Sequence, residues 1–547
     1  MILKLCKYLG IPIILVSMIF CGSRQERVDD ERPNIVVIIA DDMGYSDLGC
    51  FGSEISTPNL DELARHGTIF SQFYTAATCS PTRAMFYTGT DHHIAGLGDM
   101  AERLPGSPHL VGKPGYEGYL NNRVLSVSQS IKDAGYHTYL AGKWHLGLER
   151  NQSPKSHGFD RSFSLLSAYA NHYYPNPQYE IFWEDDDYVS YPNGEYSTDI
   201  YTDKLIDFVG DNKDDGRPFF MVAAYTSPHW PLQVPQEYAD KYKGVYDEGF
   251  DVLRRKRFEG LKEKDILNSE TSYPELPERK GTLYYVREDK LQSWDELSEE
   301  QKRLESRAME VYAGMVDNMD VNVGRLVDYL KSIGEYDNTM FVFFSDNGAA
   351  AQEANLVPEG ADTYTYMGTA NSFLAYGPQW AHASSGGYAY YKGYSSEGGL
   401  RTPMIIKMPN QQNVSAINGS FCSVKDLAPS FLDIVGADHP SSYQGRKIEP
   451  MQGQSIIPAL TENNPSIHDE DFVMGWELFG RKALRMGKWK LRGIEAPFGK
   501  TDFELFDIEK DPTESQDLSD QFPDKRAQLI EAWAQYIRDN GVILTDQ

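Results

Sequence analysis

Four stretches rich in β-branched and aromatic residues recur along much of this chain. They cover residues 34–40 (NIVVIIA), 136–141 (YHTYLA), 218–224 (PFFMVAA) and 339–345 (TMFVFFS). Apolar runs of this length are typical of parallel strands that are buried on both faces of a sheet. Because stretches with helical periodicity separate them, the pattern predicts an α/β fold with a large mixed, mostly parallel central sheet.

The longest helical pattern covers residues 304–333, where apolar side chains recur at helical spacing. Its polar residues Asp317, Asn318 and Asp320 are expected to be solvated. Shorter patterns predict further elements, namely helices at 79–88 and 125–134 and a strand at 70–75.

A polar, loop-like stretch at 438–464 precedes a C-terminal segment of short strands and a terminal helix at 523–539. We therefore predict a catalytic domain over 33–440 and a smaller C-terminal α+β domain with a short antiparallel sheet over 441–547. No internal repeat is visible.

Residues 1–21 have the pattern of an export signal, with a positively charged start and an apolar run at 11–20. The run is short for a membrane span. Cys21 stands where a lipoprotein cysteine would stand, but Phe20 departs from the usual small residue before it, so lipid anchoring at Cys21 and simple cleavage both stay open. We expect an exported protein, periplasmic, secreted or on the cell surface, with 22–32 as a linker.

The 547 residues carry a formal net charge of −28, and 41% of them are hydrophobic. The apolar content excludes a disordered chain. The acidic balance argues against nucleic acid as a partner, because that binding needs clustered Lys and Arg. An anionic substrate would need a local cationic pocket. A disulfide framework is not expected, and the spacing of Cys50 and Cys422 does not support a bridge between them.

Cys79 lies in a loop of small residues that opens into the predicted helix at 79–88. Pro81 suits the first helical turn, and Arg83 follows one turn after the cysteine. The order Cys-x-Pro-x-Arg resembles the sulfatase signature, in which the cysteine is oxidised enzymatically to formylglycine, an aldehyde. Taken alone, the pattern is equally compatible with a buried cysteine near a helix start.

Acidic and amide side chains follow two of the predicted strands. Asp41 and Asp42 end the first strand, and Asp346 and Asn347 end the strand at 339–345. Ligands bind at the carboxyl ends of strands in open α/β sheets. Three carboxylates and an amide oxygen there favour a hard divalent cation, and flexible oxygen ligation suits Ca²⁺.

Five motifs in this order resemble formylglycine-dependent sulfatases of the alkaline phosphatase superfamily: Asp41-Asp42, 79–83 (CSPTR), 142–147 (GKWHLG), Pro228-His229 and 345–348 (SDNG). Further stretches look like the bacterial arylsulfatases: 88–96, 376–381 and 475–480. The likeness covers nearly the whole chain after the export signal, and it implies an alkaline-phosphatase-like sandwich.

The resemblance also implies roles for individual residues. The implied Ca²⁺ ligands are Asp41, Asp42, Asp346, Asn347 and the modified Cys79. Arg83 would hold the formylglycine hydrate, and His145 would act on the nucleophile. Lys143, His229 and Lys392 would contact the sulfate and the leaving-group oxygen. A formylglycine-generating maturation enzyme is an implied partner.

The expected function is hydrolysis of aryl or carbohydrate sulfate monoesters to the alcohol or phenol and inorganic sulfate. A hydrated aldehyde offers one hydroxyl to attack sulfur, with Asp346 expected as the base, and the alcohol leaves protonated by His229 or Lys392. The sulfate is later expelled through the second hydroxyl, whose proton His145 would remove. The alternatives are a phosphonate or phosphate ester hydrolase of the same superfamily and a lipoprotein that binds sulfated glycans without turnover.

Two groups of residues have open roles. His92 and His93 either line the substrate pocket or are structural. The tyrosines between 388 and 394 either wall a sugar or aryl subsite or pack in the core. Substrate choice is expected to depend on the loops within 348–386 and 236–301.

Overall fold

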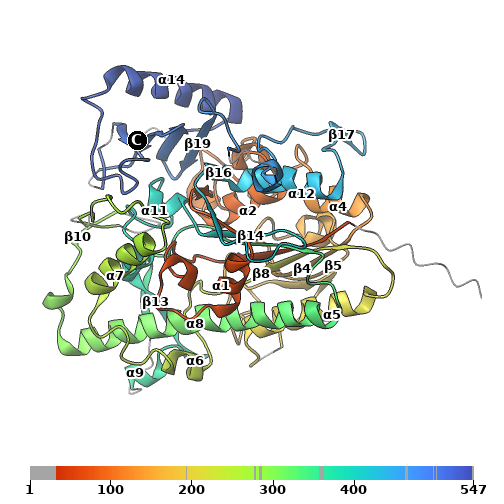
Figure 1. Cartoon of the computed structure of the whole chain (residues 1–547), viewed down its shortest axis with the longest axis horizontal. Coiled ribbons are helices and arrows are strands. Elements are labelled where there is room, and N and C mark those ends of the chain that lie inside the picture. The colour runs from red at the N-terminus through yellow and green to blue at the C-terminus, as the bar shows by residue number, and fades with distance from the viewer. Residues whose placement is uncertain are drawn as a thin grey trace, which may run out of the picture.

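A large central sheet between two layers of helices organises the computed structural model (Figure 1). The structure describes residues 32–544 apart from 193, 276–278, 282–285, 357–361, 462–465, 497 and 501. The predicted export signal at 1–21 lies outside the described residues. No helix in the described part of the chain is long and apolar enough to cross a membrane.

The central sheet has the strand order β15-β2-β14-β11-β1-β8-β4-β5-β6-β7. Its strands are β1 (Asn34–Ala40), β2 (Thr68–Phe70), β4 (His137–Lys143), β5 (Arg161–Leu165), β6 (Phe182–Glu184), β7 (Asp187–Tyr188), β8 (Phe219–Ala224), β11 (Thr339–Ser345), β14 (Met404–Lys407) and β15 (Ala416–Asn418). The five central strands β11, β1, β8, β4 and β5 run parallel, and β14, β6 and β7 pair antiparallel with their neighbours. The predicted mixed, mostly parallel sheet is confirmed.

Alternate side chains of β1 enter two separate cores. Val36 and Ile38 belong to one core, and Ile35, Val37 and Ile39 belong to the other, as expected for a strand buried on both faces. The first core is covered by α1 (Pro58–Arg65), α5 (Ser197–Asn212), α6 (Gln236–Asp240), α7 (Phe250–Glu263), α8 (Glu299–Ser332) and α10 (Gly377–Ser384). The second is covered by α2 (Cys79–Thr88), α4 (Val127–Asp133) and α12 (Leu427–Val435).

The C-terminal segment forms a separate antiparallel sheet in the order β19-β20-β21-β22, with α14 (Pro523–Asn540) packed against it (Figure 1). Its strands are β19 (Val473–Leu478), β20 (Arg481–Met486), β21 (Trp489–Gly493) and β22 (Glu504–Asp507). The short hairpin of β17 (Ser442–Tyr443) and β18 (Arg446–Lys447) and the helix α13 (Ile457–Thr461) precede it. The predicted α+β character is confirmed, and a boundary at residue 440 stays a prediction.

The expectation that the polar residues of the long helix are solvated is wrong. Asp317, Asn318 and Asp320 are buried in α8. Asp320 accepts hydrogen bonds from the backbone N–H groups of Asn59 (3.1 Å) and Leu60 (2.8 Å), the first turn of α1. A carboxylate there satisfies amide groups that lack partners within their own helix, so burial of this residue is structural.

The predicted strand at 70–75 is divided between two sheets. β2 ends at Phe70 in the central sheet, and β3 (Phe73–Tyr74) pairs instead with β16 (Cys422–Ser423). Cys50, Cys79 and Cys422 are free thiols. Tyr390, Tyr391 and Tyr394 are buried against one another, and Tyr388 is buried against Tyr45. The tyrosines between 388 and 394 therefore pack in the core.

Candidate active site

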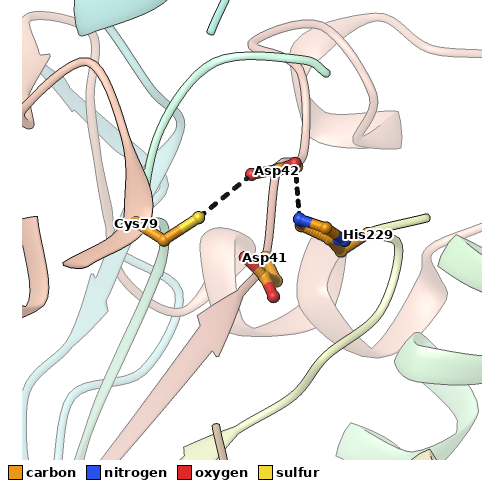
Figure 2. A group of neighbouring side chains, drawn as sticks. All are labelled: Asp41, Asp42, Cys79 and His229. Atoms are coloured by element: carbon orange, nitrogen blue, oxygen red, sulfur yellow. Dashed lines mark hydrogen bonds and ion pairs between the residues drawn. The ribbon is translucent and has the colours of Figure 1, made fainter. Parts of the chain in front are cut away.

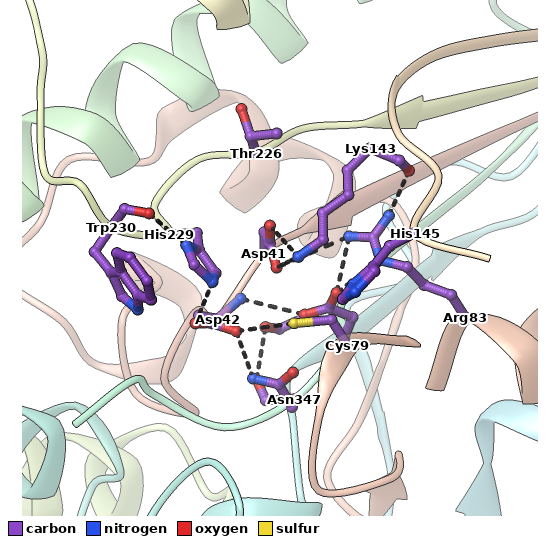
Figure 3. Close-up of polar contacts among 12 residues, drawn as sticks. Asp41, Asp42, Cys79, Arg83, Lys143, His145, Thr226, His229, Trp230 and Asn347 are labelled. Carbon is purple, nitrogen blue, oxygen red and sulfur yellow. Dashed lines mark hydrogen bonds and ion pairs between the residues drawn. The ribbon is translucent and has the colours of Figure 1, made fainter. Parts of the chain in front are cut away.

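The ends of four parallel strands and the start of one helix bring the predicted site residues together. Asp41 and Asp42 follow β1, Asp346 follows β11, His229 follows β8, and Lys143 ends β4. Cys79 begins α2. Figures 2 and 3 show the side chains of Asp41, Asp42, Cys79, Lys143 and His229 turned toward one another. They lie at the carboxyl edge of the sheet, the edge at which α/β proteins bind ligands.

Three buried ion pairs form the framework of the site, and Figure 3 shows the pair of Lys143 with Asp41. The Nζ of Lys143 lies 2.9 and 2.8 Å from the two carboxylate oxygens of Asp41. The Nζ of Lys392 lies 2.6 and 2.7 Å from those of Asp42. The Nη2 of Arg83 lies 2.8 Å from Oδ2 of Asp346.

Each acidic group is thus paired with one basic group. Burial alone would raise the pKa of Asp42, but Lys392, His229 and Lys143 hold it well below the usual range.

Cys79 lies inside this framework. Its Sγ is 3.2 Å from Nζ of Lys392 and 3.5 Å from Oδ1 of Asp42. One ligand atom from each of Asp41, Asp42, Cys79 and His229 lies within 4.8 Å of the others (Figure 2). Burial raises the pKa of the Cys79 thiol well above its ordinary value, so the unmodified side chain is a protonated thiol, which is a weak nucleophile.

His229 faces the cluster through one ring nitrogen. Its Nδ1 donates to the carbonyl oxygen of Trp230 at 2.5 Å, since that oxygen can only accept. Its Nε2 lies 3.3 Å from Oδ2 of Asp42. Burial lowers the pKa of His229 well below its ordinary value. The backbone therefore orients the ring with Nε2 toward Asp42.

His145 is held in an uncommon backbone conformation, with φ at 57°. Its Nε2 lies 3.3 Å from Oε2 of Glu102, and no described residue is a hydrogen-bond partner for its buried Nδ1. Burial lowers the pKa of His145, and Glu102 opposes that shift. Non-glycine residues in the left-handed region concentrate at functional sites, and Asp42, with φ at 66°, is the second case here.

Sequence reasoning missed Glu102. It lies in an irregular loop outside every motif, and its side chain is 37% exposed. Its proximity to His145 arises only in the folded chain, so no local pattern could have indicated it.

The residues at the strand ends fit a hard divalent cation. Asp41, Asp42 and Asn347 offer oxygen atoms, and the Nδ2 of Asn347 donates to Oδ1 of Asp42 at 2.7 Å. The Oδ1 of Asn347 is buried without a hydrogen-bond partner in the described part of the chain, and a buried unpaired oxygen is costly unless a ligand satisfies it. Oxygen donors of this kind suit Ca²⁺ or Mg²⁺.

Asp346, which was also predicted as a metal ligand, lies beside Asp41, Asp42 and Asn347, but both of its carboxylate oxygens have partners within the protein. Its Oδ2 is paired with Arg83, and its Oδ1 accepts a hydrogen bond from the backbone N–H of Asp42 at 3.2 Å. His229, which was not predicted as a ligand, belongs to the tight cluster instead. The structure thus gathers all the predicted catalytic and metal residues.

His92 and His93 belong to a buried polar network. The Nδ1 of His93 lies 2.8 Å from Oδ1 of Asp91, and its Nε2 lies 3.4 Å from Oε2 of Glu477 on β19. Tyr536 on α14 donates to Asp91 at 2.8 Å. The network joins the helix α3 (His92–Ala95) to the C-terminal sheet and helix, so His93 is structural.

The buried carboxylates and basic side chains form one cluster at the carboxyl edge of a mostly parallel sheet, an arrangement that can bind an anion beside a divalent cation. The family model described as Sulfatase matches residues 33–437, and one described as N-sulphoglucosamine sulphohydrolase, C-terminal, matches residues 386–538. The chain belongs to the sulfatase family and is a sulfuric ester hydrolase.

Similar proteins include members of this family from distant organisms. An uncharacterized sulfatase of Schizosaccharomyces pombe is 40% identical over 95% of this chain and 96% of its own length. An arylsulfatase of Klebsiella aerogenes is 36% identical over 81% of this chain and 94% of its own.

Solved structures agree in fold. The crystal structure of Ps i-CgsB in complex with k-i-k-neocarrahexaose has a TM-score of 0.66 at 24% identity, covering 94% of this chain and 95% of that one. The phosphonate monoester hydrolase of Agrobacterium radiobacter has a TM-score of 0.55 at 18% identity, covering 93% and 96%.

The His93 network makes the stability of the protein depend on pH. Burial alone would lower the pKa of His93, but hydrogen bonds to Asp91 and Glu477 raise it from 6.5 to about 9. A raised folded-state pKa stabilises the protein below the unfolded value, and this stabilisation is lost as pH rises through about 9. Wild type should therefore lose about 1 to 3 kcal/mol between pH ~6 and ~10 through this group.

Thermal or urea unfolding of wild type and His93→Gln across this pH range measures the effect. The stability difference between the two proteins should shrink as pH rises. His109→Gln, at an exposed histidine, is the control and should show no such convergence. A constant difference would contradict the assignment.

Proposed function

We propose that this sulfatase hydrolyses sulfate monoesters of phenols or carbohydrates, with Cys79 converted to formylglycine beside a bound Ca²⁺. The observation that supports it most is the position of Cys79. Its Sγ lies within 3.5 Å of both Lys392 and Asp42, inside a cluster that also offers Asp41 and His229. Asp41, Asp42, Asn347 and residue 79 would hold the cation, with Asp346 beside them.

Converted residue 79 supplies an aldehyde hydrate with two hydroxyl groups, and Ca²⁺ supplies positive charge beside it. The conversion requires a formylglycine-generating maturation enzyme as a partner. The residues around Cys79 are small or buried, so the modified side chain is shielded from bulk water.

The charge balance of the framework favours an anionic ester as substrate. Three carboxylates oppose three permanent cations: Asp41, Asp42 and Asp346 against Arg83, Lys143 and Lys392. Their formal charges cancel, so a bound divalent cation leaves the site positive. Fixed positive charge in a water-poor site stabilises an anionic transition state without reorganisation.

The basic residues have defined roles in the proposed reaction. Lys143 and Lys392 bind sulfate oxygens, and Arg83 holds Asp346 and the hydroxyl groups of residue 79. Lys392 donates a proton to the leaving alcohol oxygen. His229, whose ring proton is on Nδ1, presents Nε2 beside that oxygen and accepts the hydrogen bond of the released alcohol. His145, oriented by Glu102, accepts a proton through its unpaired Nδ1 when the sulfate is released.

The substrate assignment rests on relatives and on charge. Arylsulfatase is the name of the Klebsiella aerogenes relative, and a structural neighbour is bound to D-glucosamine-2-N,6-O-disulfate. A phosphonate monoester hydrolase shares the fold, so phosphonate or phosphate ester hydrolysis is the second candidate. Turnover of an aryl sulfate compared with the matched aryl phosphate separates the two.

The predicted export signal supports a periplasmic, secreted or cell-surface location. Membrane contact would occur only through lipid anchoring at Cys21.

The state of residue 79 is the first test. Peptide mass spectrometry on active enzyme should find formylglycine at position 79, and Cys79→Ala should abolish turnover of 4-nitrophenyl sulfate. Cys422→Ala, at another buried free thiol, controls for loss of a core thiol. Full turnover by protein with an intact Cys79 thiol would refute the proposal.

Removal of the cation should affect both activity and stability. After chelation, activity should be lost and then restored by Ca²⁺. At about 100 times its Kd, Ca²⁺ should add about 2.7 kcal/mol of stability, seen as a higher Tm. Asn347→Ala should reduce this shift, whereas Asn338→Ala, at the other end of β11, should keep it. An unchanged Tm and activity after chelation would exclude the metal.

Glu102→Gln tests the orientation of His145. The variant should lower kcat by about tenfold. Because Glu102 opposes the lowering of the His145 pKa by burial, its loss should move the acid limb of the kcat–pH profile to lower pH. Glu531→Gln on the exposed face of α14 is the control. An unshifted acid limb would remove Glu102 from the scheme.

A further inference from the structure

A row of aromatic rings extends from His229 away from the ion pairs. Tyr169 lies nearly parallel to the His229 ring, with 6.1 Å between centroids and 9° between planes. Trp230 lies 4.5 Å from Tyr169, and Phe373 lies 5.6 Å from Trp230. We call Tyr169, Trp230 and Phe373 the aromatic row. In Figure 3, Trp230 lies beside His229 on the side opposite Arg83.

Three segments that are distant in sequence supply the row. Tyr169 lies between β5 and β6, Trp230 lies between β8 and α6, and Phe373 begins β13 (Phe373–Tyr376). All three are only partly buried, whereas His229 is 4% exposed. The row therefore leads from the enclosed reaction centre toward open space.

The aromatic row lies where the alcohol part of the substrate would bind. His229 presents Nε2 to the leaving oxygen, so the carbon skeleton attached to that oxygen must lie near the His229 ring. Tyr169 and Trp230 are the aromatic neighbours of that ring. Flat aromatic groups bind such surfaces by stacking and by burying apolar area.

Polar side chains next to the row are already engaged. The Nδ2 of Asn171 donates to Ala370, and its Oδ1 accepts from two backbone N–H groups. The Nε2 of Gln233 donates to two backbone oxygens. His172 contacts Ser197 and the backbone oxygen of His229. Apart from the second N–H of the Asn171 amide, these donors cannot also bind the hydroxyls of a sugar without losing present partners.

Charge also disfavours a densely sulfated substrate. The chain carries a formal net charge of −28, which repels polyanions at long range. Beside His145, the partly exposed carboxylate of Glu102 adds a negative group next to the reaction centre.

We infer that the aromatic row is the binding subsite for the alcohol part of the substrate and that it selects a flat aromatic alcohol bearing a single sulfate. The inference rests on the proposed function of the same site and specifies its substrate class. Phe373 lies in the 348–386 loop expected to govern specificity, whereas the tyrosines between 388 and 394 do not contribute, because they are buried in the core.

A matched pair of inhibitors isolates the subsite. Benzenesulfonate and methanesulfonate carry the same anionic head, and only the first has a ring. In wild type, benzenesulfonate should inhibit 4-nitrophenyl sulfate hydrolysis with the lower Ki. Tyr169→Ala should raise the Ki of benzenesulfonate about threefold to tenfold and leave that of methanesulfonate unchanged. Tyr169→Phe keeps the ring and should behave as wild type.

Phe373→Ala is an independent variant on another segment and should change the same ratio of Ki values. Tyr188→Ala, at an exposed tyrosine on β7, is the control and should not. For 4-nitrophenyl sulfate, both row variants should raise KM with little change in kcat, because stacking acts equally on bound substrate and transition state.

The outcomes distinguish failure of the proposed function from failure of the aromatic row as the subsite. If wild type does not hydrolyse aryl sulfates, the proposed function fails. If it does, but the Ki ratio is unchanged in both Tyr169→Ala and Phe373→Ala, the aromatic row is not the subsite. A larger rise of KM for glucose 6-sulfate than for 4-nitrophenyl sulfate in these variants would also overturn the inference, because it would make the row a sugar subsite.

Discussion

The pairing of buried carboxylates with buried basic side chains at the carboxyl edge of the sheet is the constraint on which the site depends. Removing such groups from water is costly, and the cost is offset only when every charge has a partner. Here Lys143 faces Asp41, Lys392 faces Asp42, and Arg83 faces Asp346. The pairs hold oxygen atoms and ammonium groups around Cys79 in positions that a divalent cation and a sulfate group can use.

The C-terminal sheet supports this arrangement from outside the catalytic fold. The Nη1 of Arg481 on β20 donates to the carbonyl oxygen of Gly393 at 2.7 Å, and the N–H of Gly393 donates to Ala77 at 2.7 Å. Gly393, the residue after Lys392, therefore links the loop before Cys79 to the second sheet. Lys490 on β21 pairs with buried Glu397 at 2.7 Å, which fixes the segment after Lys392.

Much of the central fold could be predicted, because a run that is apolar on both faces has few alternatives to a buried strand. β1 and β11 have the predicted bounds. β4 continues to Lys143, beyond the predicted end at 141, because Asp41 neutralises a lysine that would otherwise avoid the interior. The expectation that Asp320 is solvated was wrong for a related reason, because the partners that allow its burial lie on α1.

The sequence alone was enough to predict the buried strands, the acidic residues that follow two of them and the cysteine motif at the start of a helix. These features are local patterns with local physical causes. Only the tertiary structure decided that Glu102 reaches His145, that His93 is structural, and that Tyr169, Trp230 and Phe373 form one row beside His229. Such contacts join segments that are far apart in the chain, and they exist only once the sheet has brought its loops to a common edge.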